Sequence, residues 1–119
     1  MTGPFGVSKR QDGEGAVRLL VSGEIDGDVS AALSLLLVNA AAQDGVERLT
    51  VDLGRVPFLA AAGVRSLLSG REEALRRGCD YRVVNAPATV ADTLRAAGLA
   101  GLLRLTTAQA EQPAVSLRR

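Results

Sequence analysis

Residues 51–64 read VDLGRVPFLAAAGV, a stretch that contains the end of a strand, a loop and the start of a helix. The β-branched and apolar residues from Arg48 to Leu53 predict the strand. Pro57 has no N–H for a central ladder bond, so the loop begins before it. From Ala62 to Arg77 apolar residues recur at helical spacing, and Gly78 follows as a C-terminal cap. Strand-to-helix junctions of this kind are where α/β domains place functional groups.

The same alternation of strand and helix patterns continues on both sides of this junction. The other expected elements begin with an edge strand from Phe5 to Arg10 and a strand from Ala16 to Ile25, in which Val17, Leu19 and Val21 alternate on one face. A helix follows from Val29 to Gln43, capped by Asp26 and ended by Gly45, with an apolar stripe of Val29, Leu33, Leu36, Leu37 and Ala40. After it we expect a strand from Tyr81 to Val84, a helix that begins at a Thr89–Asp92 capping box and ends at Gly98, and a last edge strand from Leu102 to Leu105. This order predicts an α/β fold. We expect a small mixed sheet of four to five strands, mostly parallel after an N-terminal hairpin, with three to four helices packed on one face. Residues 1–106 are expected to form one domain, and the polar tail 107–119 is expected to fray.

The composition is typical of a small interaction domain. The chain has 119 residues, of which 47% are apolar and 23% charged, and its net charge is only +1. This length supports one core, and the small charge gives no reason to expect nucleic acid as a partner. With 0 His and 1 Cys the usual catalytic bases and zinc ligands are almost all missing, and 3% aromatic residues leave few stacking platforms. We therefore expect no enzyme activity, metal, cofactor or nucleic acid.

The carboxylates of Glu24, Asp26 and Asp52 are the residues that best suit acid–base chemistry, but a chain this short has little room for a deep substrate cleft. The N-terminal segment has no apolar run of the signal-peptide type. The longest apolar stretch, Leu33 to Ala42, is shorter than the roughly 20 residues of a membrane span. The lone Cys79 suggests a reducing compartment. We expect no membrane span and a cytoplasmic location.

Several short motifs, taken in order, resemble the STAS domain of anti-sigma factor antagonists. The matching residues are Gly23-Glu24-Ile25-Asp26, Asp52-Leu53, Val56, Phe58-Leu59, Gly63-Val64 and Gly98-Leu99, and the resemblance covers roughly residues 17–105. It implies a partner-switching role, in which the domain binds an anti-sigma factor that is also a serine kinase and so frees a sigma factor. In this family the kinase phosphorylates a serine in an Asp-Ser-Ser-Gly loop. The added negative charge then breaks the complex.

This chain departs from the family at that loop, which here reads Ala60-Ala61-Ala62-Gly63. The phosphoacceptor position is Ala61, whose methyl group has no hydroxyl to modify. Two interpretations stay open besides an unrelated binding role: a domain that binds its anti-sigma partner constitutively, or a STAS component of another assembly such as a signalling scaffold or a lipid-transport complex. The residues expected to bind the partner are Asp26, Leu59, Ala61, Val64 and Arg65.

A few other residues have specific expected roles. Ser66 and Ser69 are alternative phosphoacceptors, although ordinary structural or surface roles are favoured for both. Asp52 is expected to accept N–H bonds from the loop backbone, and Arg55 and Arg65 to make the loop mildly cationic. A close approach of another backbone would explain Gly70 inside a helix, and so would simple tolerance of a glycine there. Cys79 is expected to be a small buried filler.

Overall fold

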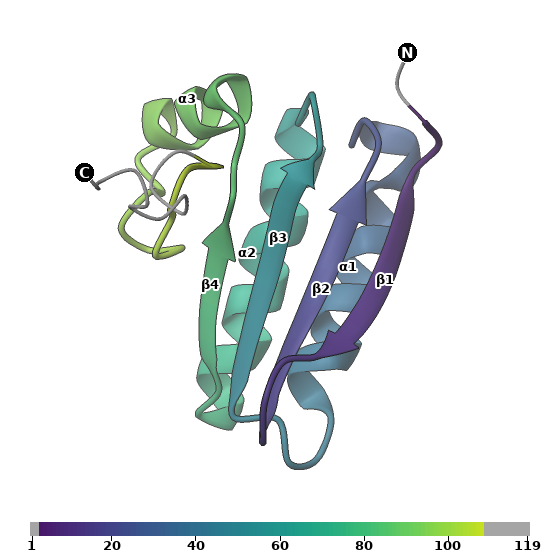
Figure 1. Ribbon diagram of the computed structural model, residues 1–119. Coiled ribbons are helices and arrows are strands. Elements are labelled where there is room, and N and C mark those ends of the chain that lie inside the picture. Colours follow the sequence, from purple (N-terminus) through teal and green to yellow (C-terminus); the bar gives the residue numbers. More distant parts are fainter. Residues whose placement is uncertain (1–2, 109–119) are drawn as a thin grey trace, which may run out of the picture.

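The computed structural model describes residues 3–108, which form a four-stranded sheet and three helices (Figure 1). In chain order the elements are β1 (Gly6–Gln11), β2 (Ala16–Ser22), α1 (Gly27–Ala42), β3 (Arg48–Arg55), α2 (Ala61–Arg77), β4 (Asp80–Val84) and α3 (Ala88–Ala96). The strand order is β1-β2-β3-β4, with β1 antiparallel to β2 and the other neighbours parallel. The α/β class and the mixed sheet after an N-terminal hairpin are therefore confirmed.

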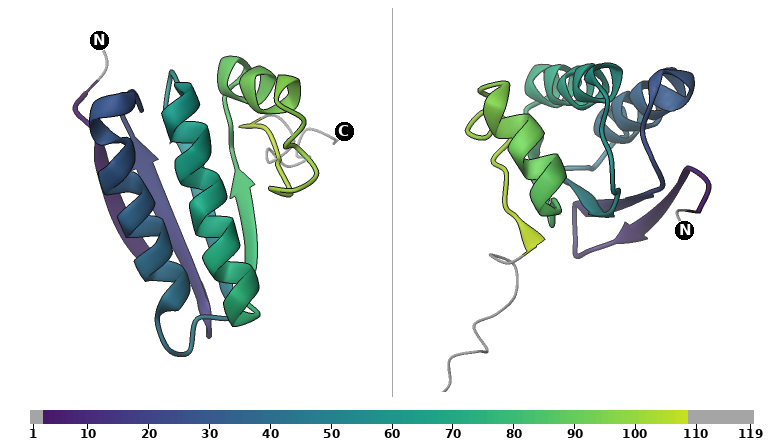
Figure 2. Two further views of the ribbon diagram at one scale, coloured as in Figure 1. Left: turned by 180° about the vertical axis from the view of Figure 1, so that it is seen from behind. Right: turned by 90° about the horizontal axis from the view of Figure 1, so that it is seen from above.

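Helices α1 and α2 lie side by side on one face of the sheet, and no helix formed by residues 3–108 lies on the other face (Figure 2). On β2 the side chains of Val17, Leu19 and Val21 point to the helices and are buried, as their alternation predicted. Leu33 and Leu37 of α1 meet them from the other layer and are fully buried. Each such side chain contributes roughly 1.5–3 kcal/mol through its removal from water. The core lies between the sheet and the helices, as expected.

Gly70 allows α1, α2 and β4 to approach one another closely. A Cβ atom at this position would lie 2.9 Å from the Cβ of Leu37 and 2.9 Å from the hydroxyl oxygen of Tyr81. The Tyr81 hydroxyl donates a hydrogen bond to the carbonyl oxygen of Leu67 on α2 (2.8 Å), and burial raises the pKa of Tyr81. Gly70 is therefore explained by close packing, but the side chains of Leu37 and Tyr81 approach it rather than another backbone.

Strand β2 ends earlier than predicted, and α1 ends without a glycine cap. The backbone turns at Gly23 (φ 90°), so β2 stops at Ser22, and Ile25 forms only an isolated bridge further on. Asp26 caps α1 as predicted, because its Oδ1 accepts a hydrogen bond from the N–H of Asp28 (2.9 Å). The C-cap is Gln43 rather than Gly45, which lies beyond it.

The start of α3 also differs from the prediction. The helix begins after Pro87, and no side chain caps it. The Thr89 hydroxyl donates instead to the carbonyl oxygen of Pro57 (3.3 Å), so the predicted capping box is wrong. Gly98 adopts the left-handed conformation (φ 77°) directly after the C-cap Ala97, which confirms it as the stop signal.

The edge strand predicted from Leu102 to Leu105 is wrong, because residues 100–104 form turns and Arg104 has a positive φ of 49°. The segment nevertheless runs along the outer edge of β4. The N–H of Val83 donates to the carbonyl oxygen of Leu103 (3.0 Å), and Thr107 pairs with Ala86 in an isolated bridge. Of the tail expected to fray, residues 109–119 lie outside the described residues.

Two residues of the predicted apolar stripes are on the surface. Leu36 of α1 is 41% exposed and Leu75 of α2 is 60% exposed, because no further layer covers the outer side of these helices. Their apolar character was therefore a misleading sign of burial. None of the helices within residues 3–108 is long and apolar enough to cross a bilayer.

Candidate functional site

The Asp26 loop and the alanine loop are joined by backbone hydrogen bonds. Ile25, directly before Asp26, pairs with Leu59 in a parallel bridge. The N–H of Ile25 donates to the carbonyl oxygen of Phe58 (3.0 Å), and the N–H of Ala60 donates back to the carbonyl oxygen of Ile25 (2.8 Å). The two segments, far apart in the sequence, therefore form one surface at the ends of β2 and β3.

Helix α2 begins inside the alanine loop without side-chain help. Its N-cap is Ala60, one residue earlier than the sequence suggested, and no side chain accepts from the first turn. The carbonyl oxygen of Ala60 accepts from the N–H groups of Gly63 (2.9 Å) and Val64 (3.1 Å). The first turn contains no acidic residue. A serine or aspartate cap would stabilise this helix by about 1 kcal/mol, so the alanines forgo stability at this point.

Gly63 lets the first turn of α2 lie directly on the joined loops. A Cβ atom here would come within 2.6 Å of Leu59 Cδ1 and 2.7 Å of Ile25 Cγ2. Ile25 is fully buried and Leu59 is 4% exposed, so neither side chain has free space to move into. The position of the alanine loop depends on this contact.

We expect Gly63→Ala to lower the free energy of unfolding by about 1–2 kcal/mol, because the added methyl overpacks this contact even as it favours the helix. Urea unfolding followed by circular dichroism measures the change. Gly101→Ala is the control, since no atom lies within 4 Å of a Cβ atom there. Equal stability of the two variants would contradict the tight contact.

The residues expected to bind a partner differ in exposure. Asp26, Ala61 and Arg65 are exposed, and Val64 is half-buried. Leu59 is buried, so it supports the loop from inside and offers no surface. Its neighbour Phe58 is 51% exposed and was not among the expected binding residues. A large apolar residue directly after Pro57, outside any periodic stripe, was the available signal.

The two alternative serines have structural hydrogen bonds. Ser66 is 1% exposed; its hydroxyl donates to the carbonyl oxygen of Ser30 (2.7 Å) and accepts from the hydroxyl of Ser34 (2.9 Å). Ser66 therefore joins α2 to α1. Ser69 donates to the carbonyl oxygen of Arg65 one turn earlier (3.1 Å).

Asp52 is the centre of a hydrogen-bond cluster on the sheet face opposite the helices. Its carboxylate accepts from the N–H of Gly54 (2.9 Å), as expected, and also from Arg18 (2.8 Å) and the side-chain amide of Asn85 (2.9 Å). Burial alone would lower the pKa of Arg18, but its hydrogen bonds to Asp12 and Asp52 raise it. The cluster fixes where β3 enters the loop.

Cys79 and the acidic side chains form no metal-binding group within residues 3–108. Cys79 is 6% exposed, and burial raises the pKa of its thiol, in agreement with the expected filler role. No group of three or more potential metal ligands comes together in this part of the chain.

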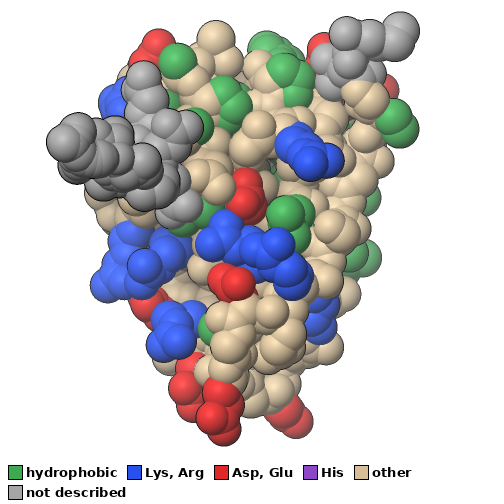
Figure 3. Space-filling model, viewed as in Figure 1, with side chains coloured by type: hydrophobic (Ala, Val, Ile, Leu, Met, Phe, Trp, Pro, Cys, Tyr) green, Lys and Arg blue, Asp and Glu red, His purple; other side chains and the backbone are tan. Residues whose placement is uncertain are grey.

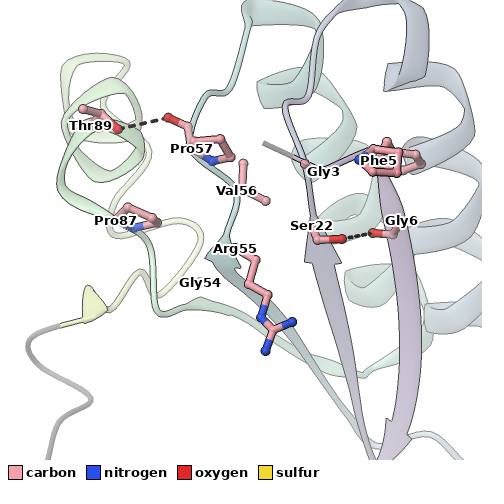
Figure 4. A pocket seen from close by; sticks show the side chains of 12 residues that line it. Gly3, Phe5, Gly6, Ser22, Gly54, Arg55, Val56, Pro57, Pro87 and Thr89 are labelled. Carbon is pink, nitrogen blue, oxygen red and sulfur yellow. Dashed lines mark hydrogen bonds between the residues drawn. The ribbon is translucent and has the colours of Figure 1, made fainter. Parts of the chain in front are cut away.

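An open groove of about 860 Å³ lies at the ends of β2 and β3, beside the first residues of the loop that follows β3 (Figure 4). Its apolar wall includes Phe5, Val56, Pro57 and Pro87. Arg55 extends from the end of β3 along the groove and forms no ion pair with any other described residue. The alanine loop is not part of the groove lining, so Arg55 and Arg65 belong to different surfaces.

Comparisons with solved structures identify similar proteins. An anti-sigma factor antagonist from Mycobacterium paratuberculosis superposes with a TM-score of 0.78 at 25% identity, covering 89% of this chain and 90% of that one. The anti-sigma factor antagonist SpoIIAA in its unphosphorylated form gives 0.72 at 19% identity, covering 86% and 89%. A sulfate transporter family protein from Wolinella succinogenes gives 0.67 at 19% identity, covering 77% and 76%. At 19% identity, SpoIIAA and the sulfate transporter family protein show a likeness of fold alone.

A comparison with characterised protein sequences found no match. A family model described as "Mlab, STAS domain" matches residues 8–106, which is most of the chain and includes β2, α1, β3, α2, β4 and α3. Together with the joined loops and the likeness to anti-sigma factor antagonists, this match leads to one conclusion: the chain belongs to the STAS domain family.

Proposed function

We propose that this domain is a protein-binding regulator that engages an anti-sigma factor with serine kinase activity and is not phosphorylated at the usual loop. Binding uses the exposed side chains of Asp26, Phe58, Ala61 and Arg65 together with the half-buried Val64. The domain itself catalyses no reaction. It acts only by binding to its partner.

The alanine loop at the exposed start of α2 carries this proposal. The motifs on either side of the loop support Ala61 as the counterpart of the family's phosphoacceptor, and a methyl group cannot accept a phosphate. Ser66, the nearest buried hydroxyl, is hydrogen-bonded between α1 and α2 and is not accessible to a kinase. The small uncharged surface at Ala61 therefore stays the same in the presence of kinase and ATP.

We expect Ala61→Asp to weaken binding to the cognate anti-sigma kinase by at least about tenfold, because an unpaired carboxylate would be buried in the interface. The substitution does not endanger the fold, since a negative charge in the first turn of a helix is favourable. Isothermal titration calorimetry measures the affinity, and Ala61→Asn is the matched neutral control.

The phosphorylation part of the proposal has its own test. Incubation of the kinase with ATP is expected to leave the native chain unmodified, whereas Ala61→Ser introduces an acceptor and gains one phosphate by mass spectrometry. A phosphate on the native chain within this loop would overturn the proposal.

A second candidate function is a STAS component of a different assembly, favoured by the matched family model, whose description names Mlab. In that case the partner is no kinase, and the alanine loop needs no acceptor. Unchanged affinity of Ala61→Asp for an anti-sigma kinase, or no binding of that kinase by the native chain, would support this second candidate.

A further inference from the structure

The sheet face opposite the helices carries a row of arginines. Arg10 of β1 pairs in register with Arg18 of β2, and Arg18 pairs with Thr50 of β3. Thr50 in turn pairs with Arg82 of β4, so the row crosses the whole sheet. Figure 3 shows Lys and Arg atoms as a broken band across the middle of this face. Because neighbouring strands are only about 4.8 Å apart, these cations repel one another unless anions lie near them.

In the β1–β2 part of the row, Arg18 is closely paired with carboxylates and Arg10 is not. Arg18 contacts Asp12 (3.3 Å) and Asp52 (2.8 Å), and its side chain is 18% exposed. Arg10 reaches only to 3.8 Å from the already shared Asp12, and its side chain is 58% exposed. The guanidinium group of Arg10 is therefore only weakly paired and is largely exposed to solvent.

The β3–β4 part of the row is short of carboxylates as well. Arg82 (2.9 Å) and Arg104 (2.6 Å) share the single carboxylate of Asp80. Arg48 and Arg55 have no ion pair within residues 3–108. The face as a whole has more arginines than aspartates, although the entire chain has a net charge of only +1. Positive charge is thus concentrated on this face.

The arginine row is continuous with the apolar groove. Next to the groove lies a smaller hollow of about 350 Å³, whose lining includes Ser8, Leu20 and Asp52, and both depressions share Ser22, Gly54 and Arg55 in their linings. Arg55 stands at this junction (Figure 4). One path therefore leads from an apolar groove, past an unpaired guanidinium group, onto a positively charged sheet face.

We propose that this path is a second docking surface, which takes an extended acidic segment of a partner protein. An apolar side chain of that segment fills the groove, and its carboxylates lie along the arginine row. The apolar groove favours a peptide over nucleic acid, because an apolar side chain can fill it and a sugar–phosphate backbone has none to offer. The surface is separate from the alanine loop, so both can be occupied together.

A labelled synthetic peptide in which leucines precede a run of glutamates is the probe. In a fluorescence-polarisation titration at low salt, Arg10→Gln and Arg55→Gln are each expected to weaken its binding roughly two- to fivefold, the range of an exposed ion pair. Both side chains are exposed, so the fold is unaffected. Arg95→Gln on α3 is the matched control and is expected to have no effect, since its side chain is 53% exposed and lies outside the path.

Several results would overturn the proposal. One is that a peptide with lysines in place of the glutamates binds as tightly as the acidic peptide. Another is that the arginine variants bind the acidic peptide as tightly as the Arg95→Gln control does. A third is that the peptide shifts the amide NMR signals of residues 58–65 instead of those of β1–β3. Tighter binding of a DNA oligonucleotide than of the peptide would assign the face to nucleic acid instead. Ala61→Asp is expected to bind the peptide normally, which separates this surface from the proposed kinase-binding loop.

Discussion

Gly70→Val is expected to lower the free energy of unfolding by about 3 kcal/mol, because the new side chain has no space between α1, α2 and β4. Its Cβ atom would lie 2.9 Å from Leu37 Cβ, which the backbone of α1 holds in place. On the other side the hydroxyl oxygen of Tyr81 lies 2.9 Å away and is held by its bond to Leu67. Neither neighbour is the free end of a mobile side chain. The helices have to separate to admit the valine.

Chemical denaturation at several urea concentrations measures this loss, and two further variants isolate its cause. Gly70→Ala is expected to lower the free energy of unfolding by less than Gly70→Val does, because alanine favours the helix by about 1 kcal/mol over glycine and this gain partly offsets the clash. Gly27→Ala, at the open start of α1, is expected to be neutral or slightly stabilising, since no atom lies within 4 Å of a Cβ atom there. A Gly70→Val protein as stable as the native chain would show that α1 and α2 pack less closely than described.

Asp52→Ala is expected to lower the free energy of unfolding by about 2–3 kcal/mol. The substitution leaves the half-buried Arg18 with less negative charge nearby and the side-chain amide of Asn85 without its acceptor. The carboxylate holds these two side chains and the N–H of Gly54 through bonds of 2.8–2.9 Å. Loss of the hydrogen bond from the N–H of Gly54 frees the backbone at the point where β3 leads into the loop that we propose binds the partner.

The matched control for this substitution is Asp92→Ala on α3. The Asp92 side chain is 75% exposed and contacts Arg95 alone, at 3.3 Å, so its removal is expected to change stability by no more than about 0.5 kcal/mol. Thermal unfolding of both variants distinguishes the two environments. Equal losses would mean that the Asp52 cluster behaves as an ordinary surface ion pair.

Much of the fold was predictable because local chemistry settles it. Asp26 marks the start of α1 through its own side chain, and Gly98 marks the end of α3 through its left-handed backbone. The alternation on β2 assigned Val17 and Leu19 to the core. These signals act over a few residues, so they can be recognised without knowledge of the tertiary structure.

The errors arose where distant segments decide the outcome. Leu102 to Leu105 has strand-like composition, but Arg104 turns the backbone with a positive φ, and the segment pairs with β4 through isolated bonds. Thr89 had a cap motif, yet its hydroxyl bonds to Pro57 on another element. The exposure of Leu75 depends on whether a further layer covers α2, which no local pattern reveals.

The candidate site was predictable in part for the same reason. The likeness of the alanine loop to a known motif is visible in the sequence, and its pairing with Ile25 follows once β2 and β3 are adjacent. The arginine row was not predictable, because Arg10, Arg18 and Arg82 are brought into line only by the register of separate strands. A shift of one residue would send these side chains to the other face.

The two outer edges, or rims, of the sheet differ in whether an extended chain of another molecule can pair with them. Backbone of residues 103–107 already occupies the rim of β4, whereas within residues 3–108 no strand pairs with the outer rim of β1. That rim offers unsatisfied N–H and C=O groups to any other extended chain. Lys9 and Arg10 lie on it, and their like charges oppose the stacking of one β1 on another, which protects the protein from aggregating strand to strand.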